Sequence, residues 1–288
     1  MSEADAGRRR RRVPRLTSGS LRLELESKVE YIDFVHAMTE KLARMAGLNR
    51  DRSFQTGLAV REGLINAIRH GNRGDPGKKV IVAFLLRPGT FCIRIRDQGD
   101  GFDFGRPPNP LDPENLYLAN GRGIFLMRHF AEEVRFRRPE DGGTEVELIQ
   151  RMGRSRSTGG ARRAPVATEL SEGGEGMKAS VRKIGDVYVL DLAGKITIGA
   201  GDLILREAVN ALLEEGHRNI VLNLERVSYM DSAGIGELVA CRKRAKDHRG
   251  GVKLLNPSGK VSDLLHLTKL EEIFEIFNSE ERALASFS

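Results

Sequence analysis

The chain has 288 residues, of which 40% are hydrophobic, and this is enough for two domains of ordinary size, each with its own core. No apolar run approaches the roughly 20 residues that a membrane-spanning helix needs, so we expect a soluble protein with no membrane partner. The two cysteines, Cys92 and Cys241, match neither a disulfide framework nor a metal-ligand spacing, which favours a reducing cytoplasm.

The net charge of +7 comes from two segments, because residues 1–20 carry +4, residues 151–178 carry +3, and the remainder is formally neutral. We therefore expect no basic face that reads nucleic acid sequence and no specific nucleic acid partner. We interpret residues 1–20 as a basic disordered tail. A weak, salt-dependent contact of this tail with RNA, DNA or acidic lipid stays open.

In the first half, the predicted helices are grouped before and between runs of predicted strands. Ser27 and Glu30 have the spacing of a capping box, which predicts a helix that ends near Gly47. The other predicted helices cover residues 51–70, closed by Gly71, and 122–132. Period-two alternation predicts strands over residues 21–26, twice within 78–97, and over 133–138 and 143–149. Helices gathered before and between antiparallel strands indicate an α+β sandwich of one sheet and one helical layer.

Residues 152–176 are rich in Gly, Ser, Arg and Pro, which is typical of a flexible linker. The domains are therefore expected at residues 21–151 and 177–288. After the linker, strand and helix take turns, which indicates an α/β domain. The expected elements are a strand pair within 181–194, strands at 219–227 and 251–257, and helices over 202–215, 233–248 and 259–267.

Four short motifs in the first half occur in a fixed order. Glu62 and Asn66 lie one helical turn apart, DQGDG follows a strand at residues 97–101, GRG opens a helix at 121–123, and GGT follows at 142–144. Each motif alone is weak, but together they resemble the Bergerat ATP-binding fold shared by gyrase, MutL and the histidine kinases. The segments REGLINAIRHGN and GRGIFLMRHFAEEV also resemble those of the bacterial anti-sigma factor serine kinases.

This resemblance implies ATP and Mg²⁺ as ligands and gives roles to single residues. Asp97 accepts a hydrogen bond from the adenine amine, Asn66 contacts Mg²⁺, and Glu62 is the catalytic base. The remaining implied nucleotide-binding residues are Gly99, Gly101, Gly121, Arg122, Gly123 and Thr144. Glycines allow close backbone approach, and a helix N-terminus favours phosphate.

Histidine kinases are the nearest alternative within this fold. They need a phosphoacceptor histidine on a long helical hairpin, and the only upstream histidine, His36, is expected to be a helix surface residue without such a hairpin. His70 precedes Gly71 at a helix end, where histidine is favoured for capping, so we assign it a structural role.

The segment YMDSAGIGELV, residues 229–239, follows a predicted strand and opens a helix, which makes Ser232 a helix N-cap candidate. The segment also resembles the phosphorylation site of STAS domains in anti-sigma factor antagonists, in which the serine after Asp is the phosphoacceptor. The similarity extends over residues 177–287. Phosphate is tolerated at a helix start, so phosphorylation of Ser232 is expected to change an interface with a partner and to leave the domain folded.

The two resemblances together imply an ATP-dependent serine kinase fused to its STAS phosphoacceptor domain, which controls transcription by partner switching with a sigma factor or similar regulator. The linker has an expected r.m.s. span of about 30 Å, so Ser232 is expected to reach the nucleotide site in cis or across a homodimer. The rival hypothesis is a non-catalytic, ATP-gated module that sequesters a regulatory partner. A nucleic acid accessory role through residues 8–12 is a third and weaker possibility.

Overall fold

The computed structural model describes residues 18–100, 109–112, 114–116, 121–152 and 176–287. Most of the predicted linker and most of the predicted tail therefore lie outside the described residues. The chain divides into two compact units, each described by itself below. The first unit holds residues up to 100 and 130–152, and the second holds residues 109–129 and those from 176 onward.

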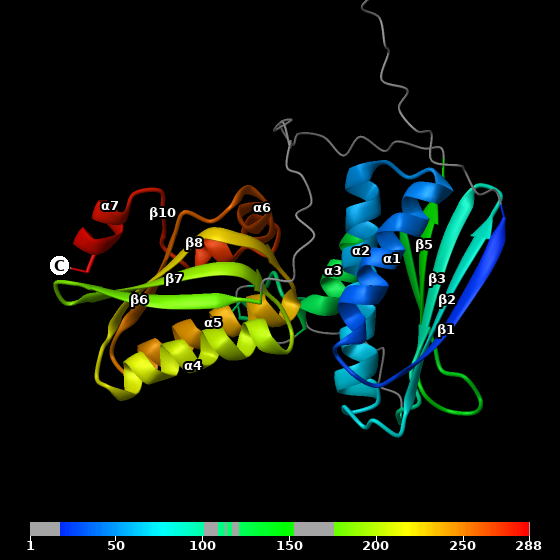
Figure 1. The fold of residues 1–288 in the computed structure, drawn as a ribbon, viewed down its shortest axis with the longest axis horizontal. Coiled ribbons are helices and arrows are strands. Elements are labelled where there is room, and N and C mark those ends of the chain that lie inside the picture. The colour runs from blue at the N-terminus through cyan, green and yellow to red at the C-terminus, as the bar shows by residue number, and fades with distance from the viewer. Residues whose placement is uncertain (1–17, 101–108, 113, 117–120, 153–175, 288) are drawn as a thin grey trace, which may run out of the picture. The chain divides into compact units, whose positions relative to one another are not determined.

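The first unit is a two-layer α+β sandwich, as the sequence predicts (Figure 1). Its sheet has the order β1-β2-β3-β5-β4, and every neighbouring pair is antiparallel. The strands are β1 (Gly19–Glu26), β2 (Lys79–Arg87), β3 (Thr90–Arg96), β4 (Glu133–Arg137) and β5 (Glu145–Arg151). The helices are α1 (Tyr31–Ala46), α2 (Arg50–Ile65) and the π-helix η1 (Asn66–Gly71).

Strand register explains where the first core lies. Ile93 of β3 lies opposite Phe84 of β2 and Leu148 of β5, and all three side chains are buried. Alternate residues of each strand face the two helices, which lie on one side of the sheet in Figure 1 and contribute buried residues such as Ile32 and Leu64. A single apolar layer between sheet and helices therefore fixes the positions of the helix ends and strand ends that carry the motifs.

Two local predictions in this unit are wrong. The capping box does not form, because α1 begins only at Tyr31, and its N-cap, Glu30, makes no side-chain capping bond. Ser27 is instead buried, with a backbone bond to Lys78. His36 is not a plain surface residue, because its ring bonds Glu40 and packs edge-on against Phe54 of α2 at 6.4 Å between ring centroids.

The helix α3 (Arg122–Phe130) is shorter than expected and lies in the second unit up to His129. The predicted first domain, residues 21–151, includes this helix, so the contacts divide the chain differently from the sequence pattern. The domain limits stay a prediction.

The second unit is an α/β domain, as expected. Its sheet has the order β10-β9-β8-β7-β6, in which β6 and β7 are antiparallel and the other pairs are parallel. Figure 1 shows α4 and α5 on one face of the sheet and α6 and α7 on the other. The strands are β6 (Lys178–Ile184), β7 (Val187–Ile196), β8 (Asn219–Met230), β9 (Gly251–Leu255) and β10 (Ile276–Phe277). The helices are α4 (Ala200–Glu214), α5 (Ser232–Asp247), α6 (Gly259–Leu267), the 3₁₀ helix η2 (Leu270–Glu272) and α7 (Glu280–Ala285).

The elements after α6 are absent from the sequence prediction. A buried lysine accounts for their position, because Lys253 of β9 donates to the carbonyl and hydroxyl of Ser286 at 2.7 and 2.8 Å. The same ammonium group lies 4.3 Å from the ring centroid of Phe287. A cation on a strand thus holds the C-terminal helix over the sheet.

Within the described ranges, no helix combines the length and the apolar character that crossing a lipid bilayer demands.

Candidate functional site

The helix that carries Glu62 changes its winding at Asn66, the other polar residue of the motif. α2 ends at Ile65, and the chain continues as the π-helix η1, which closes with a bond from the N–H of Asn72 to the carbonyl of Ala67 at 2.8 Å. Single π-turns inside helices occur frequently at functional sites. The sequence predicts one helix over 51–70 and gives no sign of this change of pitch.

Glu62 and Asn66 lie in the same helical turn, because the N–H of Asn66 donates to the carbonyl of Glu62. The Glu62 side chain is only 2% exposed. The side-chain Nδ2 of Asn66 is buried and has no hydrogen-bond partner among the described residues. A buried polar atom without a partner costs free energy, which a ligand that supplies the missing contact recovers.

Asp97 lies where β3 ends and ties the DQGDG segment to the strand β5. Its Oδ1 accepts from the backbone N–H groups of Gly99 at 2.9 Å and Thr144 at 3.0 Å, and its own N–H donates to the carbonyl of Thr144. No described residue donates to Oδ2. Burial raises the pKa of this carboxyl group, and the two N–H donors oppose the shift. Asp97 is thus a fixed carboxylate with one oxygen still available as an acceptor.

Three glycines make this close arrangement possible. A Cβ atom on Gly71 would lie 2.4 Å from the Asp97 carboxylate, and one on Gly99 would lie 2.0 Å from the carbonyl oxygen of Gly71. Gly143 has φ of +81°, and a Cβ there would lie 2.1 Å from the carbonyl oxygen of Asp97. The end of η1, the DQGDG segment and the GGT segment therefore meet around Asp97 with no room for side chains.

Thr144 completes the part of the site that lies in the first unit. It is 6% exposed, and its Oγ1 is buried without a hydrogen-bond partner among the described residues. The structure thus brings Asp97, Gly99 and Thr144 together beside the π-helix that begins at Asn66.

Asn72 is a site residue that sequence reasoning missed. It is fully buried, its Nδ2 donates to the carbonyl of Lys79 at 3.0 Å, and its Oδ1 accepts from the N–H of Gln98 at 2.8 Å. It therefore joins the end of η1 to β2 and to the DQGDG segment. The only sequence signal is a polar residue directly after the glycine that closes the helix, and many exposed turns share that pattern.

The GRG motif lies in the other compact unit. Arg122 opens α3, is 1% exposed and donates to the carbonyl of Leu116 at 2.7 Å, and burial lowers its pKa to about 10. Gly121 has φ of +94°, with open space where a Cβ would lie. Gly101 lies outside the described residues. That Gly101, Gly121, Arg122 and Gly123 share a cavity with Asp97 stays a prediction.

Ser232 is not the N-cap of its helix. Asp231 has this role, because its Oδ1 accepts from the N–H of Gly234 at 3.0 Å while Oδ2 accepts from the N–H of Ile198 at 3.0 Å. The prediction of Ser232 as the cap is therefore wrong. Ser232 is the first residue of α5 and is partly exposed. It lies where the parallel strands β7 and β8 both end, an edge at which α/β domains often place functional groups.

Ion pairs around one buried carboxylate join α5 to α4. Glu237 is 4% exposed and accepts from Arg206 of α4 at 2.7 Å and from Arg244 at 2.6 Å. Burial raises the pKa of the neighbouring Cys241 thiol to about 12, so this cysteine stays protonated. The helix that begins at Ser232 is thus joined to α4 by a charged side-chain contact.

Comparison with known proteins gives one family match in each half of the chain. Residues 25–150 match the family model of the histidine kinase-like ATPase domain, and residues 178–283 match the STAS domain. Anti-sigma F factor of Anoxybacillus flavithermus is 32% identical over 100 residues, which cover 34% of this chain and 68% of that protein. Serine-protein kinase RsbW of Listeria monocytogenes is 23% identical over 119 residues, which cover 39% of this chain and 76% of that protein.

Among solved structures, an anti-sigma factor antagonist from Mycobacterium paratuberculosis is 21% identical, with a TM-score of 0.36, and the match covers 38% of this chain and 93% of that one. The relatives and the two family models carry the assignment. The chain belongs to the family of bacterial anti-sigma factors built on a histidine kinase-like ATPase domain, to which it joins a STAS domain.

Proposed function

We propose that the chain is an ATP- and Mg²⁺-dependent serine kinase that transfers the γ-phosphoryl group of ATP to Ser232 of its own STAS domain, in cis or between two copies. We further propose that this transfer controls transcription by partner switching, in which a sigma factor or similar regulator competes for the kinase domain. The names of the relatives, a serine-protein kinase and an anti-sigma F factor, support this class of activity.

The observation that carries the proposal is a set of unused polar atoms on the motif residues, two of which belong to the hydrogen-bonded pair Asp97 and Thr144. Asp97 Oδ2, Asn66 Nδ2 and Thr144 Oγ1 lack hydrogen-bond partners among the described residues. A carboxylate oxygen fits the adenine amine, and an amide oxygen fits Mg²⁺. An amide can present its oxygen after a rotation about its last bond, so Asn66 suits a hard cation. A bound Mg²⁺ would supply charge neutralisation for the phosphates.

In the proposed reaction, Glu62 accepts the proton of the Ser232 hydroxyl while the Ser232 oxygen forms a bond to the γ-phosphorus. The bond between the γ-phosphorus and its bridging oxygen breaks, and ADP leaves with that oxygen. Positioning and charge stabilisation are the main contributions that a protein makes to such a transfer. Asn72 and the three glycines around Asp97 keep the adenine acceptor in place.

The position of Ser232 suits a switch that leaves the fold intact. Asp231 supplies the capping bonds, so a phosphate on Ser232 removes none of them. The dipole of α5 favours a negative group at this end of the helix. The added charge then acts on a partner surface, where it repels a protein that packed against the unmodified hydroxyl.

The rival function is a non-catalytic module that clamps a partner when ATP is bound. The burial of Glu62 favours it, since a base that is 2% exposed does not face an incoming hydroxyl in this structure. The variant Glu62→Gln separates the two functions because it keeps the size of the side chain and removes its basicity.

The test is incubation with γ-labelled ATP and Mg²⁺, together with a nucleotide-binding titration on the same samples. The kinase predicts labelled wild type, unlabelled E62Q, and equal ATP affinity for both. Wild-type protein that binds ATP and takes up no label contradicts the kinase and supports the binding module.

A further inference from the structure

The pairing of β2 with β3 ends just before the candidate site. The last pair of this ladder is Ile81 and Arg96, and the same register would place Lys79 opposite Gln98. The main-chain N–H groups of Lys79 and Gln98 instead donate to side-chain oxygen atoms. Asp97, which lies between Arg96 and Gln98, is therefore the residue at which regular pairing of β3 with β2 gives way to side-chain contacts.

Two side-chain amides occupy the place of the missing ladder bonds. Asn72 Nδ2 donates to the carbonyl of Lys79 at 3.0 Å, and Asn72 Oδ1 accepts from the N–H of Gln98 at 2.8 Å. The Oε1 atom of Gln98 accepts from the N–H of Lys79 at 2.6 Å. The Asn72 amide thus acts as a peptide group inserted between the ends of two strands, and the three bonds form one closed circuit. Buried backbone groups need such partners, so the circuit depends on both side chains.

This circuit acts on the direction of the Asp97 side chain. Asp97 continues the alternation that turns every second residue of β3 toward the helices, so its carboxylate faces η1. There it lies against Gly71, where a Cβ atom would be 2.4 Å from the carboxylate. Asn72 follows Gly71 and Gln98 follows Asp97 in the chain. The bond between Asn72 and Gln98 therefore ties together the two segments that touch at the carboxylate.

The GGT segment engages only one oxygen of Asp97. Oδ1 accepts from the N–H groups of Gly99 and Thr144, and the contact with η1 holds the carboxylate from a second element. We infer that Asn72 and Gln98 set the preference of the nucleotide site for adenine, because they fix the direction in which Asp97 Oδ2 meets the base amine. This inference rests on the proposed function, in which Asp97 accepts a hydrogen bond from that amine.

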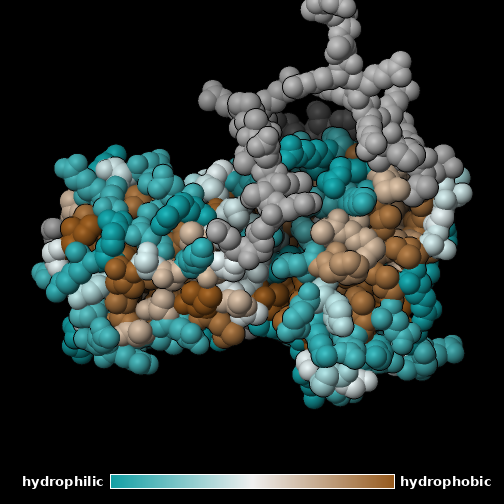
Figure 2. Space-filling model, viewed as in Figure 1, coloured by the Kyte–Doolittle hydropathy of each residue, from teal (hydrophilic) through white to brown (hydrophobic). Residues whose placement is uncertain are grey.

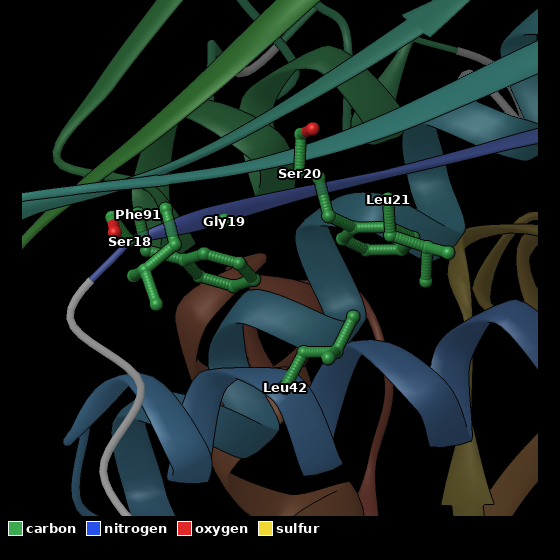
Figure 3. Close-up of a pocket in the computed structure, with 8 residues that line it drawn as sticks. Ser18, Gly19, Ser20, Leu21, Leu42 and Phe91 are labelled. Carbon is green, nitrogen blue, oxygen red and sulfur yellow. The ribbon is translucent and has the colours of Figure 1, made fainter.

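The cavity between β1 and α1 is not an alternative place for the base. Figure 2 shows a hydrophobic surface over α1 and a mostly hydrophilic surface at the end of the first unit where α2 continues into η1. The cavity has a volume of about 150 Å³, and Leu21, Leu42 and Phe91 point into it (Figure 3). Asp97 follows Phe91 by about 20 Å of extended strand. A base amine needs a fixed acceptor, which Asp97 supplies and aliphatic or aromatic side chains do not.

The preference for ATP over inosine triphosphate measures the role of the two amides. The two nucleotides share the sugar and the phosphates, but the inosine base has a carbonyl oxygen where adenine has its amine, so only ATP donates to Asp97. Titration of the full chain with each nucleotide, in competition with a fluorescent ATP analogue, gives the ratio of the two affinities. We expect the wild type to prefer ATP about tenfold or more. A purely structural residue would change the melting temperature and leave this ratio unchanged.

Gln98 allows a conservative pair of variants, because its side chain is exposed. Gln98→Met removes the acceptor for the N–H of Lys79 and should lower the ATP preference about threefold, whereas Gln98→Glu keeps an oxygen there and should retain most of it. Asn72→Ala loses both bonds of its amide and should reduce the preference to about one. Since both residues belong to one circuit, the double variant N72A/Q98M should lower the ratio no further than N72A.

Asn223→Ala is the matched control. The Asn223 amide in the second unit also donates through Nδ2, to Asp191 at 2.7 Å, and accepts through Oδ1, from the N–H of Glu225 at 3.2 Å. This variant should melt earlier and keep the ATP preference of the wild type.

Circular dichroism verifies that each variant is folded. Folded N72A and Q98M that keep the wild-type ratio overturn the inference and leave the nucleotide site standing. If N72A does not fold, equal ratios for Q98M and Q98E overturn it. A wild type that binds neither nucleotide overturns the proposed function itself.

Discussion

Two adjacent glycines give a sharp test of the geometry around Asp97. Gly142 and Gly143 both have positive φ, at +89° and +81°. An added Cβ meets nothing within 4 Å at Gly142, but at Gly143 it lies 2.1 Å from the carbonyl oxygen of Asp97. The substitutions G142A and G143A therefore impose the same backbone strain and differ only in the collision with Asp97.

The expected magnitudes follow from this difference. Left-handed backbone strain costs about 1–2 kcal/mol for a residue with a Cβ, and this is the whole expected effect of G142A. For G143A, the chain must also open by about 0.9 Å to reach the 3.0 Å that Cβ contacts respect. Overpacking of this kind costs about 1–3 kcal/mol more. The same movement separates the Thr144 N–H from Asp97 Oδ1, now 3.0 Å apart, and so displaces the proposed adenine acceptor.

Differential scanning calorimetry and titration with a fluorescent ATP analogue, both on the full chain, measure the two effects. We expect G142A to bind nucleotide like the wild type, and G143A to unfold earlier and to bind at least about tenfold more weakly, as expected for about 1.4 kcal/mol or more. Equal melting temperatures and equal affinities for G142A and G143A would refute the argument that the GGT segment holds Asp97 in a nucleotide site.

Three further predictions concern the two carboxylates that organise the sites. Asp97→Asn should keep the free energy of unfolding within about 1 kcal/mol of wild type or raise it, because it removes a buried charge and keeps an acceptor for Gly99 and Thr144, yet it should abolish measurable ATP binding in a fluorescence titration. Because burial raises the pKa of Asp97 in the folded chain, acidification should weaken nucleotide binding at a higher pH than it would for an ordinary aspartate. The free-energy cost of burying the ionised carboxylate is present above the folded pKa and is lost as the pH falls through it. A plot of nucleotide affinity against pH that follows the ordinary aspartate pKa would contradict this prediction. Asp231→Ala should destabilise the second unit by about 2–4 kcal/mol in urea unfolding, because it leaves two buried N–H groups without acceptors, whereas Ser279→Ala, which removes a single exposed cap of α7, should cost less than about 1 kcal/mol.

The fold class could be predicted because each half has a clear hydrophobic rhythm. In β3, alternation places Phe91, Ile93 and Ile95 on the helix side, and the structure buries all three. The C-terminal elements could not be predicted, since their position depends on Lys253, a buried cation whose partners at Ser286 and Phe287 lie more than thirty residues away. Hydrophobic patterns describe one element at a time and contain no information on such a contact.

The candidate site was accessible from sequence only as far as local motifs reach. The DQGDG and GGT segments do meet at Asp97, but the sequence does not reveal that Gly71 and Asn72 join them, because those contacts link elements that are separate in the sequence. The N-cap of α5 was assigned to the wrong neighbour because Asp and Ser are both good caps. The N–H of Ile198, which lies after the end of β7, donates to Asp231, and this long-range bond favours Asp231 over Ser232 as the cap.

Phosphoryl transfer to Ser232 is the central claim, and intact-protein mass spectrometry with and without MgATP tests it most directly. Wild type and Ser258→Ala, a serine that precedes α6 in a comparable position, should each gain one phosphoryl group, and Ser232→Ala should gain none. Fragmentation should locate the added mass on Ser232. Wild-type protein that binds ATP but keeps its mass, or an S232A variant that gains the same mass, would contradict the account.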